Sequence, residues 1–320
     1  MLKKIAVLTA GGDAPGMNPA IRSVVRYAIN QKLEVMGVFR GWWGLINEEL
    51  KPLTQRSVSG IIGEGGTILK TARCPEFRTQ EGMARAYATI KKNNIDGLVV
   101  IGGNGSFAAA HEFYKKFNVS CVGIAASIDN DVNGIDYTIG TDTAINTALD
   151  AIDKIRDTAT SMERIFVVEV MGRESGFIAL TVALAGGCED VIIPEKEIDL
   201  NLICHDIVHG NLIGKLSWII VLAEGAGKAD DIAGQITEMT GLETRTVVLG
   251  HVQRGGRPTA VSRDLALNLG KAAVDCLIAG RTDLVLGLGA GKIVEVDFET
   301  AIRKKEFKFD NFYKLIKILT

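Results

Sequence analysis

Short runs rich in Val, Ile and Ala alternate along this chain with longer segments in which apolar residues return every three or four positions. Short apolar runs between glycine or polar residues are typical of buried strands, and the longer period is typical of helices. A helix is predicted over 143–158, where Ile145, Ala148, Ile152 and Ile155 fall on one stripe. The predicted strands are Lys4–Thr9, Glu34–Phe39, Gly97–Ile101, Val119–Ala125, Ile165–Val170, Val191–Ile193, Trp218–Ala223 and Thr246–Leu249.

Strands that alternate with helices indicate an α/β protein with mainly parallel sheets covered by helices on both faces. A chain of 320 residues is long enough for two lobes. No Pro-rich linker, charge block or low-complexity stretch separates them. We therefore expect two interlocked Rossmann-like lobes with a cleft between them, connected in part by the predicted helix over 143–158.

Composition narrows the class of protein. A net charge of -2 argues against a nucleic-acid binder, and no apolar run reaches the roughly 18 residues that a membrane-spanning helix needs. The first residues pass directly into a predicted strand, unlike a signal peptide. We expect a cytoplasmic protein that contacts neither nucleic acid nor membrane. Five scattered cysteines without a C-x-x-C pair predict reduced thiols rather than a disulfide framework or a zinc site.

An acidic run follows one of the predicted strands. The apolar stretch from Val119 to Ala126 leads directly into Ser127-Ile128-Asp129-Asn130-Asp131. Carboxylates two positions apart on an extended segment point to the same side, so one can accept a proton while the other orients its neighbour or holds a metal ion. A polar turn that caps the next helix is the alternative interpretation, because Asp and Asn are common turn residues.

Glycine-rich turns follow three more predicted strands, at 11–18, 102–106 and 171–176. Glycine lets the backbone approach a phosphate, and a following helix offers free N–H groups. None of the three is a Walker A loop or a G-x-G-x-x-G dinucleotide motif, and each alone could be structural. Together with the acidic run they favour a phosphate-handling cleft at the carboxyl ends of the strands.

Basic residues in predicted loops support that interpretation, because phosphoryl transfer depends on positioning and on neutralising charge. A planar guanidinium grips phosphate oxygens at two points, although a lone arginine is usually solvated and a lone histidine is usually structural. The candidate residues are Arg73, Arg164, Arg173, Arg245, Arg254 and His251.

These motifs, in this order, resemble the bacterial ATP-dependent 6-phosphofructokinases. The resemblance extends from residue 4 to about residue 257, and the tail after about Thr282 matches poorly. It is carried by the segments Gly11–Asn18, Arg73–Phe77, Ile128–Asp131, Met171–Arg173 and Gly250–Gly256.

The resemblance implies transfer of the γ-phosphoryl group of ATP to the 1-hydroxyl of fructose 6-phosphate. Asp129 would be the general base, with Ser127 and Asp131 beside it. Arg173 and the backbone at Gly12 would stabilise the transition state. Mg²⁺ would accompany ATP, with Asn104 and Asp129 as its candidate ligands. The nucleotide would be bound by Gly12, Trp42, Arg73, Cys74, Gly103, Asn104, Gly105 and Ser106.

The resemblance also implies which residues bind the sugar phosphate, where the two lobes begin and end, and how subunits assemble. Residues 1–140 with 253–303 would form the larger nucleotide-binding lobe, and 141–252 with 304–320 the smaller sugar-phosphate lobe. A homotetramer is implied, in which Arg164 and Arg245 enter the substrate site of a neighbouring subunit. The other sugar-phosphate residues would be Ser127, Asp129, Asp131, Met171, Gly172, Arg173, Glu224, His251 and Arg254.

Asn104 departs from the family, which usually has aspartate there as a magnesium ligand. An amide keeps the carbonyl ligand and loses the charge, so weaker metal binding is expected. A catalytically weak or silent regulatory subunit that binds the sugar phosphate is therefore an alternative. Two milder changes are Ser127 for threonine and Trp42 for tyrosine.

Two further positions bear on the phosphoryl donor. Pyrophosphate-dependent relatives tend to have aspartate at Gly105 and lysine at Ala126, and this chain has neither. ATP is therefore the preferred donor, with pyrophosphate as the alternative.

The family's effector site binds a nucleoside diphosphate or phosphoenolpyruvate between subunits. Gln55, Ile213 and Ser217 stand where that site commonly has basic residues, which predicts blunted effector control. The matching residues are Arg22, Arg26, Arg156, Glu189 and Lys215.

Overall fold

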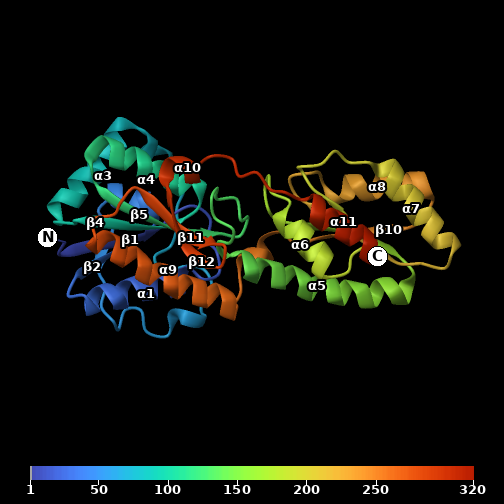
Figure 1. Cartoon of the computed structure of the whole chain (residues 1–320), viewed down its shortest axis with the longest axis horizontal. Helices are drawn as coiled ribbons and strands as arrows, with labels where there is room; N and C mark the ends of the chain where they lie inside the picture. The colour runs from blue at the N-terminus through green and yellow to red at the C-terminus, as the bar shows by residue number, and fades with distance from the viewer. Residues whose placement is uncertain (1) are drawn as a thin grey trace. The chain divides into compact units, whose positions relative to one another are not determined.

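A computed structural model describes residues 2–320. The chain divides into two compact units, residues 1–143 with 254–305 (unit 1) and residues 144–253 with 306–320 (unit 2). Each unit contains its own sheet (Figure 1). Both units are α/β, as the pattern of strands and helices predicts.

Unit 1 is built on a sheet with the strand order β12-β11-β5-β4-β1-β2-β3. Its central strands are parallel, and antiparallel pairs lie at both edges. The short strand β6 (Ile139–Gly140) pairs with the end of β5. The strands are β1 (Lys4–Thr9), β2 (Glu34–Val38), β3 (Leu50–Pro52), β4 (Gly97–Gly102), β5 (Ser120–Ser127), β11 (Leu284–Gly289) and β12 (Lys292–Asp297).

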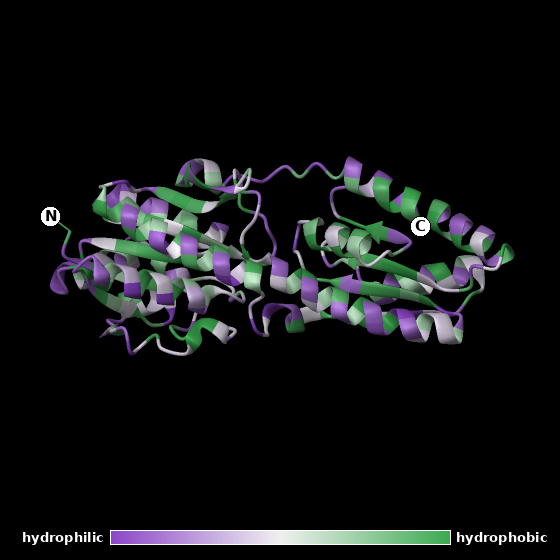
Figure 2. Ribbon diagram, turned by 60° about the horizontal axis from the view of Figure 1, so that its bottom comes forward, coloured by the Kyte–Doolittle hydropathy of each residue, from purple (hydrophilic) through white to green (hydrophobic). Residues whose placement is uncertain are grey.

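The central strands of unit 1 are apolar along their whole length because helices cover both faces of the sheet. Every residue of β4 is buried, and Figure 2 shows these strands in the hydrophobic colour. Helices α1 (Met17–Asn30) and α9 (Ala260–Ile278) lie on one face, with α3 (Gln80–Lys92), α4 (Asn104–Phe117) and α10 (Phe298–Ala301) on the other (Figure 1). The short helix α2 (Gly41–Ile46) follows β2.

Helices α1 and α9 pack closely because α9 contains a glycine at their crossing. A β-carbon on Gly270 would lie 2.6 Å from the Cβ of Ser23 and 2.9 Å from the carbonyl oxygen of Ala20. Any larger residue there would push the two helices apart.

Unit 2 contains a parallel sheet with the strand order β10-β7-β9-β8. Alternate residues of β9, namely Trp218, Ile220 and Leu222, join a core with apolar residues of α7 and α8. The strands are β7 (Ile165–Val170), β8 (Asp190–Ile192), β9 (Trp218–Ala223) and β10 (Thr244–Val248). The helices are α5 (Thr141–Met162), α6 (Phe177–Ala185), α7 (Leu200–Leu212), α8 (Ala229–Thr240) and α11 (Asp310–Leu319).

The C-terminal helix α11 is fixed to β8 by an ion pair. Lys317 Nζ lies 2.7 Å from Asp190 Oδ2 and 3.3 Å from Asp206 Oδ2. The side chain of Asp190 is completely buried, so this amine compensates a carboxylate that has no access to water.

All eight predicted strands are present, with ends that differ by up to two residues. The predicted helix over 143–158 lies inside α5. Strands β3, β6, β11 and β12 were not among the predicted strands. Two of them, β11 and β12, complete the edge of the sheet next to β5.

Candidate active site

Three of the motifs lie side by side in unit 1 because the strands before them are neighbours. The order β5-β4-β1 is parallel, and the strands end at one level: Thr9 pairs with Ile101, and Gly102 with Ala125. The turns after Thr9, Gly102 and Ser127 therefore meet at one edge of the sheet. Ligands of open α/β sheets bind at this edge.

Asp131 receives hydrogen bonds on both carboxylate oxygens. Asn104 Nδ2 donates to Asp131 Oδ2 at 3.1 Å and to the Asp131 carbonyl oxygen at 3.0 Å. Ser127 Oγ donates to Asp131 Oδ1 at 3.2 Å and accepts from the backbone N–H of Asp129 at 3.3 Å. Asn104 and Ser127 therefore fix the orientation of this carboxylate.

Asp129 is only 4% exposed, at the start of a turn with unusual backbone geometry. The next residue, Asn130, has a φ of 52°, in the left-handed region. Its buried side chain stabilises this conformation, since Nδ2 donates to the Asp136 carbonyl at 2.8 Å and Oδ1 accepts from the Thr138 N–H at 3.1 Å. Asn130 is thus a structural residue within the acidic run.

The amide of Asn104 is oriented by the same contacts. Because its NH₂ group faces the two Asp131 oxygens, its Oδ1 points elsewhere, and this buried atom has no hydrogen-bond partner in the described part of the chain. An unsatisfied buried carbonyl oxygen is suited to a hard cation such as Mg²⁺.

No group of three or more His, Cys, Asp or Glu side chains within residues 2–320 has the arrangement of a metal site. Magnesium in phosphoryl-transfer sites is commonly held by one or two protein ligands, with substrate phosphates and water completing the shell. Asn104 Oδ1 and the Asp129 carboxylate are oxygen donors of that kind.

Arg254 contacts the first glycine-rich turn. Its Nη1 donates to the Asp13 carbonyl at 3.2 Å, and a β-carbon on Gly12 would lie 2.5 Å from that nitrogen. Glycine at position 12 therefore makes room for the guanidinium.

The remaining predicted nucleotide residues of unit 1 differ in exposure. Arg73 and Gly105 are exposed, and nothing lies within 4 Å of a β-carbon built on Gly105. Ser106 is 4% exposed. Trp42 is 6% exposed and stacks on Phe77 with 4.2 Å between ring centroids, so most of the ring belongs to the core. Burial raises the pKa of the Cys74 thiol, which favours the neutral form.

In unit 2 the turn after β7 is fixed by two side chains distant in sequence. Glu224 Oε1 accepts from the N–H groups of Gly172 at 3.2 Å and Arg173 at 2.9 Å. Gln253, which is fully buried, accepts from Met171 N–H at 2.8 Å. Both Gly172 and Arg173 have positive φ values, of 144° and 53°. Glu224 therefore stabilises a strained turn that presents the exposed Arg173 side chain.

Arg164 and Arg245 come together on one carboxylate. Arg164 Nε lies 3.1 Å from Glu243 Oε2, and Arg245 pairs with the other oxygen of Glu243. His251 lies on the exposed start of the short 3-10 helix Gly250–Arg254.

The predicted effector residues belong to two groups. In unit 1, Arg22 and Arg26 lie one turn apart on α1 and donate to the carbonyls of Val58 at 3.4 Å and Gln55 at 3.3 Å. In unit 2, Glu189 lies 3.9 Å from Arg156 and 3.4 Å from Lys215.

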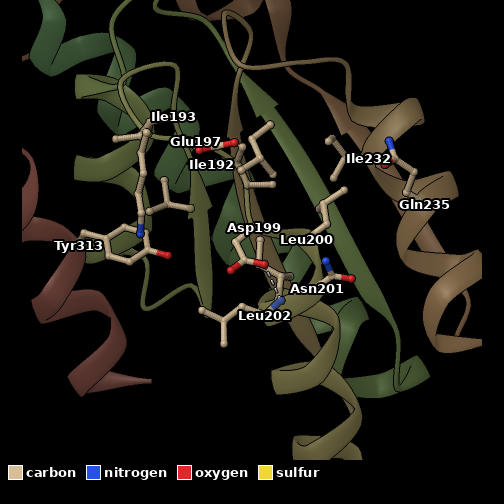
Figure 3. Close-up of a pocket in the computed structure, with 14 residues that line it drawn as sticks. Ile192, Ile193, Glu197, Asp199, Leu200, Asn201, Leu202, Ile232, Gln235 and Tyr313 are labelled. Atoms are coloured by element: carbon tan, nitrogen blue, oxygen red, sulfur yellow. Dashed lines mark hydrogen bonds between the residues drawn. The ribbon is translucent and has the colours of Figure 1, made fainter.

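Unit 2 also contains a pocket of about 710 Å³ at the end of β8 and the start of α7. Figure 3 shows Asp199, Leu200, Asn201 and Tyr313 around it. None of the predicted site residues lines this pocket.

Sequence reasoning did not identify three residues that shape the candidate site: Asn130, Gln253 and Lys305. Asn130 was part of the acidic motif, and Gln253 lay inside a matching motif, but no local signal indicated their partners. Lys305 donates to the carbonyls of Asn130 and Ile135 from a position 170 or more residues away.

Among the helices of the described residues, none combines the length and the apolar character needed to cross a membrane.

Comparison with known proteins identifies the family. The phosphofructokinase family model matches residues 4–277. An ATP-dependent 6-phosphofructokinase of Clostridium botulinum (strain Hall) is 50% identical over 319 residues, covering all of both chains. One from Clostridium acetobutylicum is 52% identical over 301 residues, covering 94% of each. The family model ends at residue 277, whereas the alignment with the Clostridium botulinum relative continues through the tail after Thr282.

Solved structures agree with this result. Phosphofructokinase from Saccharomyces cerevisiae has a TM-score of 0.90 and 35% identity, over 94% of this chain and 45% of that chain. The chain therefore spans less than half of the yeast protein. A pyrophosphate-dependent phosphofructokinase from Marinobacter aquaeolei has a TM-score of 0.85 at 21% identity, which shows a shared fold. The chain belongs to the phosphofructokinase family.

Proposed function

We propose that this protein is an ATP-dependent 6-phosphofructokinase, which phosphorylates the 1-hydroxyl of fructose 6-phosphate in glycolysis and works in the cytoplasm. The observation that carries the proposal is the acidic turn after β5. There a buried Asp129 lies beside Asp131, whose two carboxylate oxygens are held by Ser127 and Asn104. Relatives named for this activity align over the whole chain.

Asp129 is proposed as the general base. The 1-hydroxyl oxygen attacks the γ-phosphorus of ATP while its proton passes to the Asp129 carboxylate. The bond between that phosphorus and the bridging oxygen breaks, and ADP leaves with the electron pair. A positioned base of this kind contributes roughly 10²- to 10⁴-fold to the rate.

The charge on the transferred group needs fixed positive partners, because phosphoryl transfer is catalysed mainly by positioning and electrostatics. Arg173 and the backbone N–H of Gly12 are proposed for this role, and Arg73 for the nucleotide phosphates. The turn that holds Arg173 is preorganised by Glu224, so little reorganisation is needed when substrate binds.

Magnesium is the proposed cofactor, with Asn104 Oδ1 and the Asp129 carboxylate as its protein ligands. When bound, it would neutralise negative charge on the phosphates of ATP. Asn104 also holds Asp131 through its NH₂ group, so one amide serves both purposes.

The sugar phosphate is proposed to be held by His251 and Arg254, with Glu224 and Met171 at the sugar. Arg164 and Arg245 are proposed to act on the substrate of a neighbouring subunit in a homotetramer. Their shared contact with Glu243 keeps the two guanidinium groups together, as a clamp on a phosphate requires.

A second candidate is supported by one observation. The side chain at position 104 is an amide, so Asp131 is paired with a neutral donor and the metal loses one anionic ligand. A sugar-phosphate-binding subunit without turnover would tolerate this change.

The test is a coupled assay on the purified full chain with ATP, fructose 6-phosphate and Mg²⁺, and with pyrophosphate replacing ATP in a parallel arm. We expect turnover with ATP, and a loss of at least about 10²-fold in kcat for Asp129→Asn. Asp150→Asn, which changes an exposed aspartate on α5, is the control and should keep full activity. No turnover with either donor would refute the kinase proposal, and turnover with pyrophosphate alone would change the donor.

A further inference from the structure

Lys305, the last residue of unit 1, forms hydrogen bonds with the backbone of the acidic turn. Lys305 Nζ donates to the carbonyl oxygens of Asn130 at 2.8 Å and Ile135 at 2.7 Å. The preceding residue, Lys304, forms an isolated antiparallel bridge with Val132. The segment 304–305 therefore lies along the turn and joins both of its ends.

The position of the Asn130 carbonyl determines how the backbone enters Asp131. It belongs to the residue between Asp129 and Asp131, and that residue holds the left-handed φ of 52°. Apart from glycine, only Asn and Asp adopt this left-handed conformation with any frequency. Fixing this carbonyl limits rotation of the peptide plane that leads directly into Asp131.

The ammonium group also lies among carboxylates. Burial lowers the pKa of Lys305, and the charges of Asp136 and Asp131 oppose this effect only in part. The group is thus a partly buried cation that donates hydrogen bonds to two carbonyl oxygens of the turn. A lysine in such a place is more than a solvated surface charge.

We propose that Lys305 is a positioning residue for the reaction: it holds the turn from Asn130 to Asp136 and thereby sets the orientation of Asp129 and Asp131. In this role it acts through the backbone carbonyl oxygens of the turn. The effect on catalysis rests on the proposed function, whereas the effect on the turn does not. A displacement of about 1 Å in a catalytic group can cost roughly 10²-fold in rate, so a single anchor of this kind can govern turnover.

The test compares three variants of the full chain. Lys305→Met keeps the length of the side chain and removes the donors and the charge. Lys305→Arg keeps donors that can reach both carbonyls. Lys304→Met is the matched control, since this neighbouring side chain is exposed and its bridge to Val132 is made by the backbone.

Two readouts separate positioning from general stability. In hydrogen exchange, Lys305→Met should speed exchange of the amides in 130–138 at least about tenfold, while β4 and β9 keep their protection. In the coupled assay its kcat should fall about 10- to 100-fold. KM for ATP should change much less than kcat, because Asn104 contacts the turn through Asp131 while Gly12, Trp42 and Arg73 lie outside it. Lys305→Arg should restore most of both values, and Lys304→Met should match the parent.

Unchanged exchange in 130–138 for Lys305→Met would overturn the proposal, whatever the activity. Faster exchange in that segment with no turnover even in the parent would support the anchor and refute the proposed function instead. Should Lys305→Met unfold as a whole, Lys305→Gln, which retains a donor, is judged by the same two criteria.

Discussion

The guanidinium group of Arg254 occupies the space that a β-carbon on residue 12 would need, with Nη1 2.5 Å from that position. Two motifs separated by more than 240 residues are therefore fitted to each other at the same edge of the unit 1 sheet. The glycine is required here by a neighbouring side chain and not by its own backbone, because its φ is not positive.

Gly12→Ala should displace Arg254 without unfolding the protein. Because Arg254 is proposed to hold the sugar phosphate, its displacement should lower kcat/KM for fructose 6-phosphate about 10- to 100-fold. Steady-state kinetics with a thermal melt would measure both effects. Gly234→Ala is the control, because nothing lies within 4 Å of a β-carbon there. Unchanged kinetics in Gly12→Ala would mean that Arg254 does not act on the substrate.

Asn104→Asp should lower the melting temperature of the protein in the absence of metal, and Mg²⁺ should reverse this loss. Without metal, the new carboxylate would face the Asp131 carboxylate in place of a donor, so the melting temperature should fall by about 2–4 °C for each kcal/mol lost. Mg²⁺ should restore it, because residue 104 and Asp129 are the proposed metal ligands and a ligand that binds only the folded state stabilises it. Titration of the melting temperature with Mg²⁺ in the presence of ADP measures this.

Asn104→Ala separates the two causes of that change, since it removes the hydrogen bonds to Asp131 without adding a charge. We expect it to lower the melting temperature with and without Mg²⁺. An Asn104→Asp variant as stable as the parent in metal-free buffer would contradict this view of the pair.

Lys317→Met should destabilise unit 2, because it leaves the buried Asp190 carboxylate without its cation. Removing one partner of a buried ion pair costs about 3–5 kcal/mol. Chemical denaturation would measure the loss. The double variant Lys317→Met with Asp190→Asn should recover part of it, since no uncompensated charge remains. A double variant less stable than the single one would argue against this explanation.

The same ion pair predicts a pH dependence. Burial by itself lowers the pKa of Lys317, but Asp190 and Asp206 outweigh it and raise this pKa above the ordinary value of 10.5. Folding thus favours the charged amine, and its stabilisation is fully present below 10.5 and lost as the pH rises through the raised pKa. Thermal melts between pH 8 and about pH 11.5 should show an alkaline loss of stability that is smaller in Lys317→Met.

Control by effectors should be weak. The basic residues of the predicted effector site already have partners inside their own unit: Arg156 donates to the carbonyls of Gly186 at 2.6 Å and Gly187 at 2.8 Å, and Lys215 to that of Thr320 at 3.1 Å. We expect ADP or phosphoenolpyruvate to shift half-saturation by fructose 6-phosphate less than the roughly 5- to 150-fold of typical allosteric couplings. Saturation curves with and without each effector test this, and a tenfold shift would contradict it.

The central strands could be predicted because they are buried on both faces and are therefore continuously apolar. β4 illustrates this, since its sequence Gly-Leu-Val-Val-Ile-Gly has no polar residue. β12 could not be recognised in the same way. It is an edge strand in which Lys292, Glu295 and Asp297 interrupt the apolar positions, and all of its residues are partly or fully exposed.

The site was predictable as far as each motif is local. The acidic run and the glycine turns at 11–18 and 102–106 follow β5, β1 and β4, whose parallel order in unit 1 brings their ends together, whereas the turn at 171–176 follows β7 in unit 2. What could not be read from the sequence is the fixing of these turns by distant residues. Glu224 reaches Arg173 across 51 positions, and Lys305 reaches Asn130 across 175. Such contacts form only in the folded protein, so no local sequence pattern predicts them.

The order of the segments along the chain has a consequence during synthesis. Unit 1 is interrupted after Thr143 and resumes at Arg254, so a ribosome completes the sheet of unit 2 before it makes β11, the partner that flanks β5. The edge of β5 that pairs with β11 therefore remains without a partner strand while more than a hundred later residues are synthesised. At synthesis rates of about 5–20 residues per second that exposure lasts roughly 8–30 seconds. During this time an open apolar strand edge is a site for chaperone binding or aggregation.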